Sequence, residues 1–351
     1  MVKSNSNISN LQSHVVNKRV DIQYLRAFAV CMVIVFHSRA KVMPNGYLGV
    51  DLFFLISGFV LTPQLLNILS STKDEVSEST LNFLKKRFKR LMPAFLLSTV
   101  FCLLLLAIMG SCNQFESAGM QGFFSLIFLG NISADSLSGN YFNPNPNPFL
   151  HFWSLSSEWQ IYIFMPILLS SIVMLRSEFK KSKMSYVLVI VFVISLLLST
   201  FGWESNGLLG YYSPIVRIWQ FAAGSLTFLI LSKVEVNQFM IFLARLLLIL
   251  GGATLIFPIP LGRHEANLLI IITFISLILS RFQNPNMLGK LFLWTGDRSY
   301  SLYLYHLPFI YLALYSPTSG ANSAIRAIGV ICAVALTFVM ANFSYKYVEA
   351  K

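Results

Sequence analysis

The stretch that decides the fold class is residues 22–42, IQYLRAFAVCMVIVFHSRAKV. A largely apolar run of this length can cross the hydrocarbon core of a bilayer as one helix. The whole chain has the same character, with 56% hydrophobic and 11% charged residues among 351. Because soluble domains carry about 25% charged residues, this composition excludes a soluble enzyme, a nucleic-acid reader and a disordered scaffold. The sequence predicts an integral membrane protein.

Nine more apolar runs follow the first one, so we expect an all-α, multi-pass bundle of about ten transmembrane helices. An eleventh run, Gly122–Gly130, is too short to cross and is expected to be re-entrant or interfacial. The ten predicted spans are residues 22–42, 47–68, 91–110, 157–175, 185–201, 213–232, 239–257, 266–281, 299–315 and 324–344.

Lysine and arginine orient these spans, because cytoplasmic loops carry an excess of both residues. If the N-terminus is inside, 19 of the 26 basic residues lie in inner segments and 4 lie in outer segments. Both termini are therefore expected to be cytoplasmic, with residues 1–21 as a polar tail and 22–349 as the membrane domain. The tail has no hydrophobic core, so no cleavable signal peptide is expected. The four cysteines lack metal-ligand spacing, and no metal is expected.

The longest loop, about residues 111–156, is predicted to be external and contains no lysine or arginine. Its segment Asn140–Pro148 contains alternating prolines, which favour an extended backbone. Two interpretations stay open. The segment is either a surface connector or a lid beside a polar acceptor.

Ionisable residues inside a span are costly, so they mark candidate functional sites. Arg26 and His37 are eleven residues apart, which is only about 20° beyond three full helical turns. Both side chains are expected on one helix face, roughly 16 Å apart along the axis. This pairing favours a functional role for His37 over that of a buried structural histidine.

Four more polar residues are expected near the depth of His37. Asp51 opens the second span, His151 and Glu158 flank the fourth, and Arg217 begins the sixth. A carboxylate beside an imidazole fixes its tautomer and stabilises the imidazolium, as a general base requires. Arg217 can instead neutralise a carboxylate as a structural pair. The sequence leaves both interpretations open.

The basic run Lys85–Pro93, KKRFKRLMP, has an ordinary explanation as a cytoplasmic stop signal. Arg87 and Arg90 continue directly into the span, where they can bind a polyanion at the inner membrane edge. A phosphate-bearing ligand and an anionic lipid are the two candidates.

Taken together, these motifs resemble the acyltransferase 3 family of membrane-bound O-acyltransferases, which includes bacterial polysaccharide and lipopolysaccharide O-acetylases. Six or seven motifs in the same order are a specific signal. They are Tyr24–Val30 with the Arg26–His37 spacing, Gly49–Phe59, Arg87–Pro93, His151–Tyr162, Arg217–Gly224, Ser299–Pro308 and Ser344–Glu349.

Three features depart from the family pattern. Gln220 stands where members often have glutamate, and Trp159 stands where a second acidic residue is common. The sequence ends at Lys351 without the usual proline and without an appended extracytoplasmic hydrolase-like domain.

The resemblance implies transfer of an acyl group, usually acetyl, from cytoplasmic acyl-CoA to a hydroxyl of a glycan or glycolipid of the cell envelope. The expected location is the bacterial inner membrane. Arg26, Arg87 and Arg90 would bind the CoA phosphates. The catalytic group would comprise His37 as base, Asp51 or Glu158 as its partner, and His151. The cavity would be lined by Trp153, Ser154, Tyr162, Arg217, Tyr303 and His306. An acyl-histidine intermediate and an acyl group larger than acetyl both stay open.

A proton-coupled transporter of a small solute is the alternative function, because carriers also use membrane histidines and carboxylates. Many carriers show internal repeats with broken helices in matching positions. We find no counterpart of the motifs of residues 22–162 later in the chain. A structural subunit would explain the spans but not the ionisable residues inside them.

Overall fold

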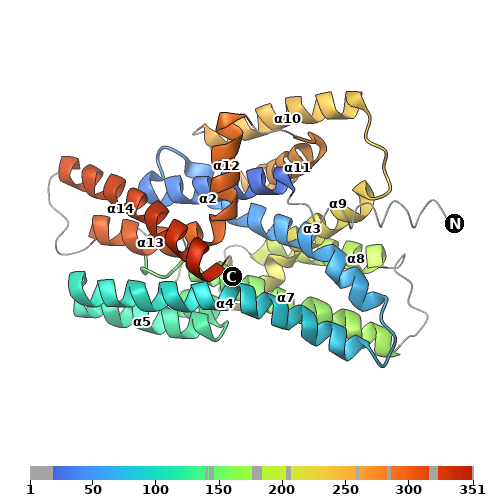
Figure 1. Ribbon diagram of the computed structural model, residues 1–351, viewed down its shortest axis with the longest axis horizontal. Helices are drawn as coiled ribbons and strands as arrows, with labels where there is room; N and C mark the ends of the chain where they lie inside the picture. Colours follow the sequence, from blue (N-terminus) through green and yellow to red (C-terminus); the bar gives the residue numbers. More distant parts are fainter. Residues whose placement is uncertain are drawn as a thin grey trace. The chain divides into compact units, whose positions relative to one another are not determined.

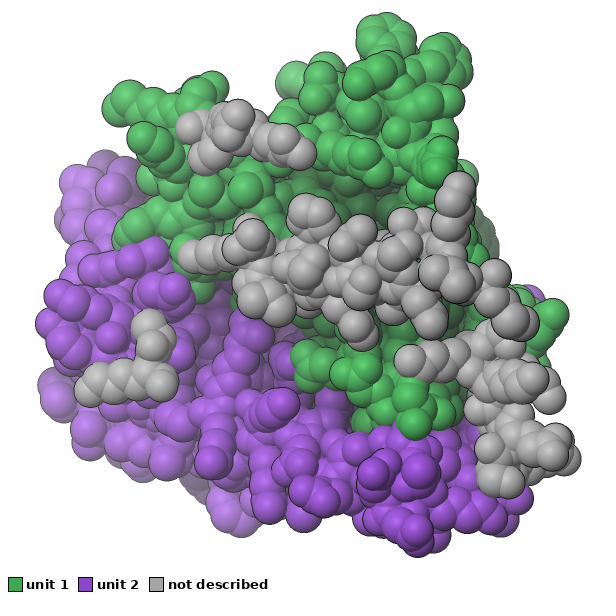
Figure 2. Space-filling view, turned by 45° about the vertical axis from the view of Figure 1, so that its right-hand side comes forward, with its two compact units in different colours: residues 1–70, 178–194, 218–297 green, residues 71–177, 195–217, 298–351 purple. Residues whose placement is uncertain are grey.

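The computed structural model shows an all-helical protein, which confirms the predicted fold class. It describes residues 19–138, 141, 146–175, 184–202, 207–257, 259, 261–282, 286–315 and 323–349, and these contain no strand. The chain divides into two compact units, coloured green and purple in Figure 2. Unit 1 comprises residues 1–70, 178–194 and 218–297, and unit 2 comprises residues 71–177, 195–217 and 298–351.

Unit 1 is a set of paired helices (Figure 1), in which α2 packs on α3 and α12, α3 packs on α9, and α10 packs on α11. Its core is formed by aliphatic and aromatic side chains of α2, α3, α9, α10 and α11. The elements are α2 (Val20–Arg39), η1 (Pro44–Leu48), α3 (Gly49–Leu69), α9 (Ile218–Leu231), α10 (Gln238–Ile256), α11 (Arg263–Leu279) and α12 (Met287–Asp297).

The helices α3 and α9 cross closely in unit 1. A Cβ atom added to Gly58 would lie 1.9 Å from the Phe221 carbonyl oxygen, and one added to Gly224 would lie 2.0 Å from the Leu55 oxygen. Small residues allow membrane helices to approach backbone to backbone. These two glycines therefore set the spacing of α3 and α9.

Unit 2 is built around α4, which packs on α5, α7 and α13, while α13 also packs on α14. Helix α8 (Met184–Gly202) begins in unit 1 and ends in unit 2. The other elements of unit 2 are α4 (Val76–Met109), α5 (Cys112–Leu126), α6 (Gly130–Ser138), α7 (Phe152–Leu175), η3 (Gly207–Leu209), η4 (Pro214–Val216), α13 (Ser299–Tyr315), α14 (Ser323–Ser344) and η5 (Tyr345–Glu349).

Each of the ten predicted spans coincides with a helix, and seven helical segments of the described residues are both long and apolar enough to cross a membrane. The helices at the other three spans, α8, α11 and α13, do not meet both conditions. The chain is thus a multi-pass membrane protein, while the count of ten and the cytoplasmic termini stay predictions. The seven segments are Val20–Arg39, Pro44–Leu69, Val76–Met109, Phe152–Leu175, Gly207–Leu231, Gln238–Ile256 and Ser323–Glu349.

The predicted loop of residues 111–156 differs from the structure, because it contains the two helices α5 and α6. Helix α5 starts at a capping box, in which the Ser111 hydroxyl accepts from the Gln114 backbone N–H and the Gln114 side chain accepts from the Ser111 N–H. Such a cap satisfies amide groups that are otherwise unpaired at a helix start. The run Gly122–Gly130 comprises the end of α5, the turn after it and the first residue of α6, and its re-entrant or interfacial location stays a prediction.

The start of α4 and the whole of helix α12 were not predicted. Helix α4 already begins at Val76, so the basic run of residues 85–90 is helical rather than a loop before the span. Helix α12 lies in the segment between the eighth and ninth predicted spans. Residues 142–145, the centre of the proposed lid, lie outside the described residues.

Candidate functional site

The predicted site residues are divided between the two units. Unit 1 contains Arg26, His37 and Asp51. Unit 2 contains Arg87, Arg90, His151, Trp153, Ser154, Glu158, Tyr162, Arg217, Tyr303 and His306. The predicted residues therefore form separate groups, and each group lies within one unit.

His37 and Arg26 lie on α2, which is an unbroken helix, so the predicted same-face relation holds. Both side chains are half-buried. The His37 Nδ1 atom is 2.9 Å from the Val33 carbonyl oxygen, one turn earlier. A carbonyl can only accept a hydrogen bond, so Nδ1 carries the proton and Nε2 is the basic nitrogen. This tautomer suits a general base that acts through Nε2.

Asp51 is buried in the first turn of α3, with 2% of its surface exposed. The Gln220 side-chain Nε2 on α9 donates to its Oδ1 at 3.1 Å. A buried carboxylate needs such donors, because an unsatisfied one is expensive. Gln220, which departs from the family's frequent glutamate, therefore supplies an amide N–H to Asp51. Sequence analysis identified both residues but did not pair them.

His151, Ser154, Tyr303 and His306 form a buried polar cluster that joins the start of α7 to α13. The Tyr303 hydroxyl donates to the His151 carbonyl oxygen at 2.9 Å and lies 2.7 Å from the Ser154 Oγ. The ring centroids of His151 and His306 are 4.9 Å apart. The structure thus places these four residues in one cluster.

The two histidines of this cluster hold opposite tautomers. His151 Nε2 lies 3.2 Å from the Leu304 carbonyl oxygen, whereas His306 Nδ1 lies 2.6 Å from the Tyr303 carbonyl oxygen. The protons are therefore on Nε2 of His151 and Nδ1 of His306. His151 is 1% exposed and His306 is 0% exposed. The contact of His151 joins the start of α7 to α13, whereas that of His306 lies within α13.

Glu158 belongs to a second polar group of unit 2. The Tyr162 hydroxyl donates to the Glu158 carboxylate one turn along α7. Arg87 of α4 is within electrostatic reach of Tyr162, Arg90 and Glu158. Arg87 is half-buried and Arg90 is exposed. Glu158 is thus grouped with the arginines predicted to bind the donor.

Arg217 lies on aromatic rings. Its guanidinium carbon is 4.2 Å from the Tyr211 ring centroid and 5.3 Å from that of Trp153, and its Nε donates to the Tyr211 carbonyl oxygen at 3.1 Å. Arginine over an aromatic face is stabilised by the ring quadrupole. These contacts give Arg217 a packing role that the sequence did not predict.

Tyr141 and Tyr211 extend this aromatic group, and sequence analysis missed both. Their rings stack with centroids 4.8 Å apart. Burial, with a smaller effect of the neighbouring Tyr211, raises the pKa of Tyr141 well above its ordinary value, so its phenol stays neutral. The signal available in sequence was the aromatic pair Tyr211–Tyr212 shortly before Arg217.

Comparison with known proteins agrees with this architecture. The family model Acyl_transf_3, described as an acyltransferase domain, matches residues 19–342. The chain is 28% identical over 348 residues to "Putative membrane-bound transacylase BcsY" of Komagataeibacter xylinus, covering 95% of this chain and 82% of that protein. No solved structure matches the chain.

Two further relatives are longer than this chain. It is 29% identical to "O-acetyltransferase OatA" of Staphylococcus aureus over 347 residues, or 93% of this chain and 55% of that protein. It is 25% identical to "Putative peptidoglycan O-acetyltransferase YrhL" of Bacillus subtilis, over 93% of this chain and 53% of that protein. The chain thus spans about half the length of these two relatives. The names of these relatives describe transacylases and O-acetyltransferases, so they give no support to the transporter alternative.

The family match covers nearly all of the described chain and includes every motif but the last, Ser344–Glu349. The chain therefore belongs to the acyltransferase 3 family of membrane enzymes, and its activity is acyl transfer.

Proposed function

We propose that this protein transfers an acetyl group from cytoplasmic acetyl-CoA to a hydroxyl of a glycan outside the bacterial inner membrane. The observation that carries the proposal is His37, a half-buried histidine with a basic Nε2 on a membrane-spanning helix of an acyltransferase. The names of the relatives, two of which are O-acetyltransferases, support a hydroxyl acceptor and an acetyl group.

The proposed step uses His37 as general base. Its Nε2 takes the proton of the acceptor hydroxyl while the hydroxyl oxygen bonds to the thioester carbon. The carbon–sulfur bond then breaks, and CoA leaves with a proton as the free thiol. His37 is preferred over His151 and His306 because it is half-buried, whereas both of those rings are fully enclosed.

Arg87 and Arg90 are the proposed phosphate ligands of the donor. They are three residues apart on α4, so they share one face of the helix. Arginine binds phosphate through paired charge-assisted hydrogen bonds. Glu158 balances part of their charge when no phosphate is present.

The direct test is an assay of the purified, reconstituted protein with radiolabelled acetyl-CoA and un-acetylated peptidoglycan glycan strands. We expect label on the glycan that mild alkali releases, because esters are alkali-labile and amides are not. CoA release that is independent of the glycan, or an alkali-stable product, would contradict O-acetyl transfer. The same assay with longer acyl-CoA donors measures the preference for acetyl.

The donor site has its own test. Replacing Arg87 and Arg90 by alanine should raise the KM for acetyl-CoA by at least roughly 10- to 150-fold, because losing even one charge-assisted contact costs about 1.5–3 kcal/mol. The matched control is Lys85→Ala with Lys86→Ala, which removes two exposed charges of the same basic run. Equal KM values for the two double variants would assign the arginines to membrane topology alone.

A further inference from the structure

A cavity of about 800 Å³ lies within unit 1, among α2, α10, α11 and α12. Its lining is apolar apart from the side chains of Tyr24, Thr273 and Asn286. None of the predicted catalytic or donor-binding residues lines it. Its volume is in the range that holds small lipophilic ligands.

The length of this cavity matches one leaflet of a membrane. On α10 its lining runs from Leu248 to Phe257, which is roughly 14 Å at the rise of an α-helix. The hydrocarbon core is about 30 Å thick, so one leaflet contributes about 15 Å. The wall that this stretch of the chain gives the cavity therefore has about the length of one phospholipid acyl chain.

A positive charge stands at one end of the cavity. Arg245 is exposed on α10, one turn before the lining residues Leu248 and Ile249, so it lies on the same helix face. Its Nη2 donates to the Ser280 carbonyl oxygen at 3.3 Å, and its guanidinium carbon is 5.6 Å from the ring centroid of Phe282. Phe282 also lines the cavity.

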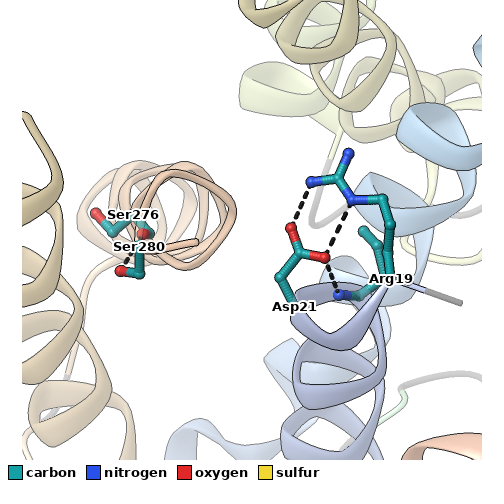
Figure 3. Close-up of polar contacts among 5 residues, drawn as sticks. Arg19, Asp21, Ser276 and Ser280 are labelled. Carbon is teal, nitrogen blue, oxygen red and sulfur yellow. Dashed lines mark hydrogen bonds and ion pairs between the residues drawn. The ribbon is translucent and has the colours of Figure 1, made fainter. Parts of the chain in front are cut away.

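Arg245 and Arg19 differ in their partners, because the charge of Arg19 is neutralised by the Asp21 carboxylate. Figure 3 shows Asp21 accepting from the Arg19 guanidinium, and Ser276 and Ser280 on the last turn of α11. Among the described residues, no carboxylate forms an ion pair with Arg245. A charged group exposed on an apolar spanning helix calls for a partner.

Two more basic residues lie at this end of the cavity. Arg281 follows the end of α11, is exposed, and has a φ of +44°, a conformation that residues other than glycine rarely adopt. Lys290 is exposed next to the lining residue Gly289. Clusters of basic residues at the inner ends of spanning helices bind anionic lipid headgroups.

We propose that this cavity binds one acyl chain of an anionic phospholipid, whose phosphate is held by Arg245. An apolar cavity with a wall about one leaflet long suits an acyl chain, and its cationic end suits a phosphate. The cavity therefore fits a phospholipid better than a neutral lipophile or a soluble anion. The site is separate from the acyl-transfer residues, so the proposal does not depend on the function proposed above.

Native mass spectrometry of the delipidated full-length protein tests this directly. The probes are phosphatidylglycerol and phosphatidylcholine with identical acyl chains, added in equal amounts. We expect at least about tenfold preference for phosphatidylglycerol, and Arg245→Gln should remove most of that preference because it deletes the charge. Lys233→Gln, which changes an exposed basic residue outside the cavity, should leave it intact.

Gly252→Leu tests whether the cavity holds the acyl chain. A Cβ added at Gly252 meets no atom within 4 Å, so a larger side chain can start from this position into the cavity, and leucine also favours the helix. We expect it to abolish retention of both lipids, whereas Gly119→Leu, at an equally open position on α5, should change nothing. Equal retention of the two lipids by the parent, or parental retention by Gly252→Leu, would overturn the proposal. A Gly252→Leu variant that loses a dimer and shows no other change would also overturn the proposal. That result would assign the cavity to a second copy of the chain.

Discussion

At the residue scale, the proposed chemistry depends on His37 more than on any other side chain. Its contact with the Val33 carbonyl oxygen fixes the tautomer with Nε2 basic. We expect His37→Gln to lower the rate of acyl transfer by about 10²–10⁴-fold, the usual contribution of a general base. Glutamine keeps the size and the hydrogen bonding of the ring but cannot take the proton.

The control for His37 is the same change at His264, an exposed histidine at the start of α11. This variant should keep the parental rate. If His37→Gln, expressed at the parental level, retains more than about a tenth of the rate, the base is not His37. His151 or His306 would then be tested in the same way.

The Asp51–Gln220 pair gives a prediction about stability. Gln220→Leu removes the amide that donates to the buried Asp51 carboxylate at 3.1 Å. A hydrogen bond to a charged group contributes about 1.5–3 kcal/mol, so the midpoint of thermal unfolding in detergent should fall. Gln238→Leu, at the exposed first residue of α10, should change stability by less than about 0.5 kcal/mol. Similar midpoints for the two variants would mean that the amide does not stabilise Asp51.

At the element scale, the crossing of α3 and α9 is the feature most sensitive to a single atom. Gly224→Ala would place a methyl group 2.0 Å from the Leu55 carbonyl oxygen, so the two helices must separate. Overpacking of this kind costs about 1–3 kcal/mol or more. Because Gln220 is one turn before Gly224 on α9, separation should also lengthen its hydrogen bond to Asp51.

The matched variant for this crossing is Gly329→Ala on α14. Its added Cβ would lie 3.6 Å from the Ala313 Cβ, an ordinary van der Waals contact. Alanine favours a helix over glycine by up to about 1 kcal/mol, so this variant should melt at or above the parental temperature. A Gly224→Ala protein that melts like Gly329→Ala would show that the crossing is not tight.

At the scale of the whole molecule, the charge asymmetry predicts the sidedness on which the proposed reaction depends. A reporter fused after Lys351 should read cytoplasmic, and one inserted after Asn145 should read external, because this orientation places 19 basic residues in inner segments and 4 in outer segments. The side of each site is measured in intact cells that carry an alkaline phosphatase or a fluorescent reporter fused at that site. If both reporters lie on one side, the odd number of spans predicted between them is wrong, and so is the sided mechanism.

The sequence by itself determined the class of the molecule and ten of its helices, but not α5, α6 or α12. Hydropathy is a local property, so each of the ten apolar runs coincides with a helix. Spacing along one helix is also local, so Arg26 and His37 are placed on one face of α2 correctly. The motifs were sufficient to identify the family, because they are read in order along the chain.

The tertiary structure decided which polar groups meet. The pairing of Asp51 with Gln220 joins residues 169 positions apart, and the contact of His151 with Leu304 joins residues 153 positions apart. No pattern along the chain encodes such a pair, because it depends on how closely two helices cross. The same reason explains why the stacking of Arg217 on Tyr211 and the leaflet-length cavity beside Arg245 were not predicted. Local sequence sets what each helix can bury, and only packing between helices sets what each buried group contacts.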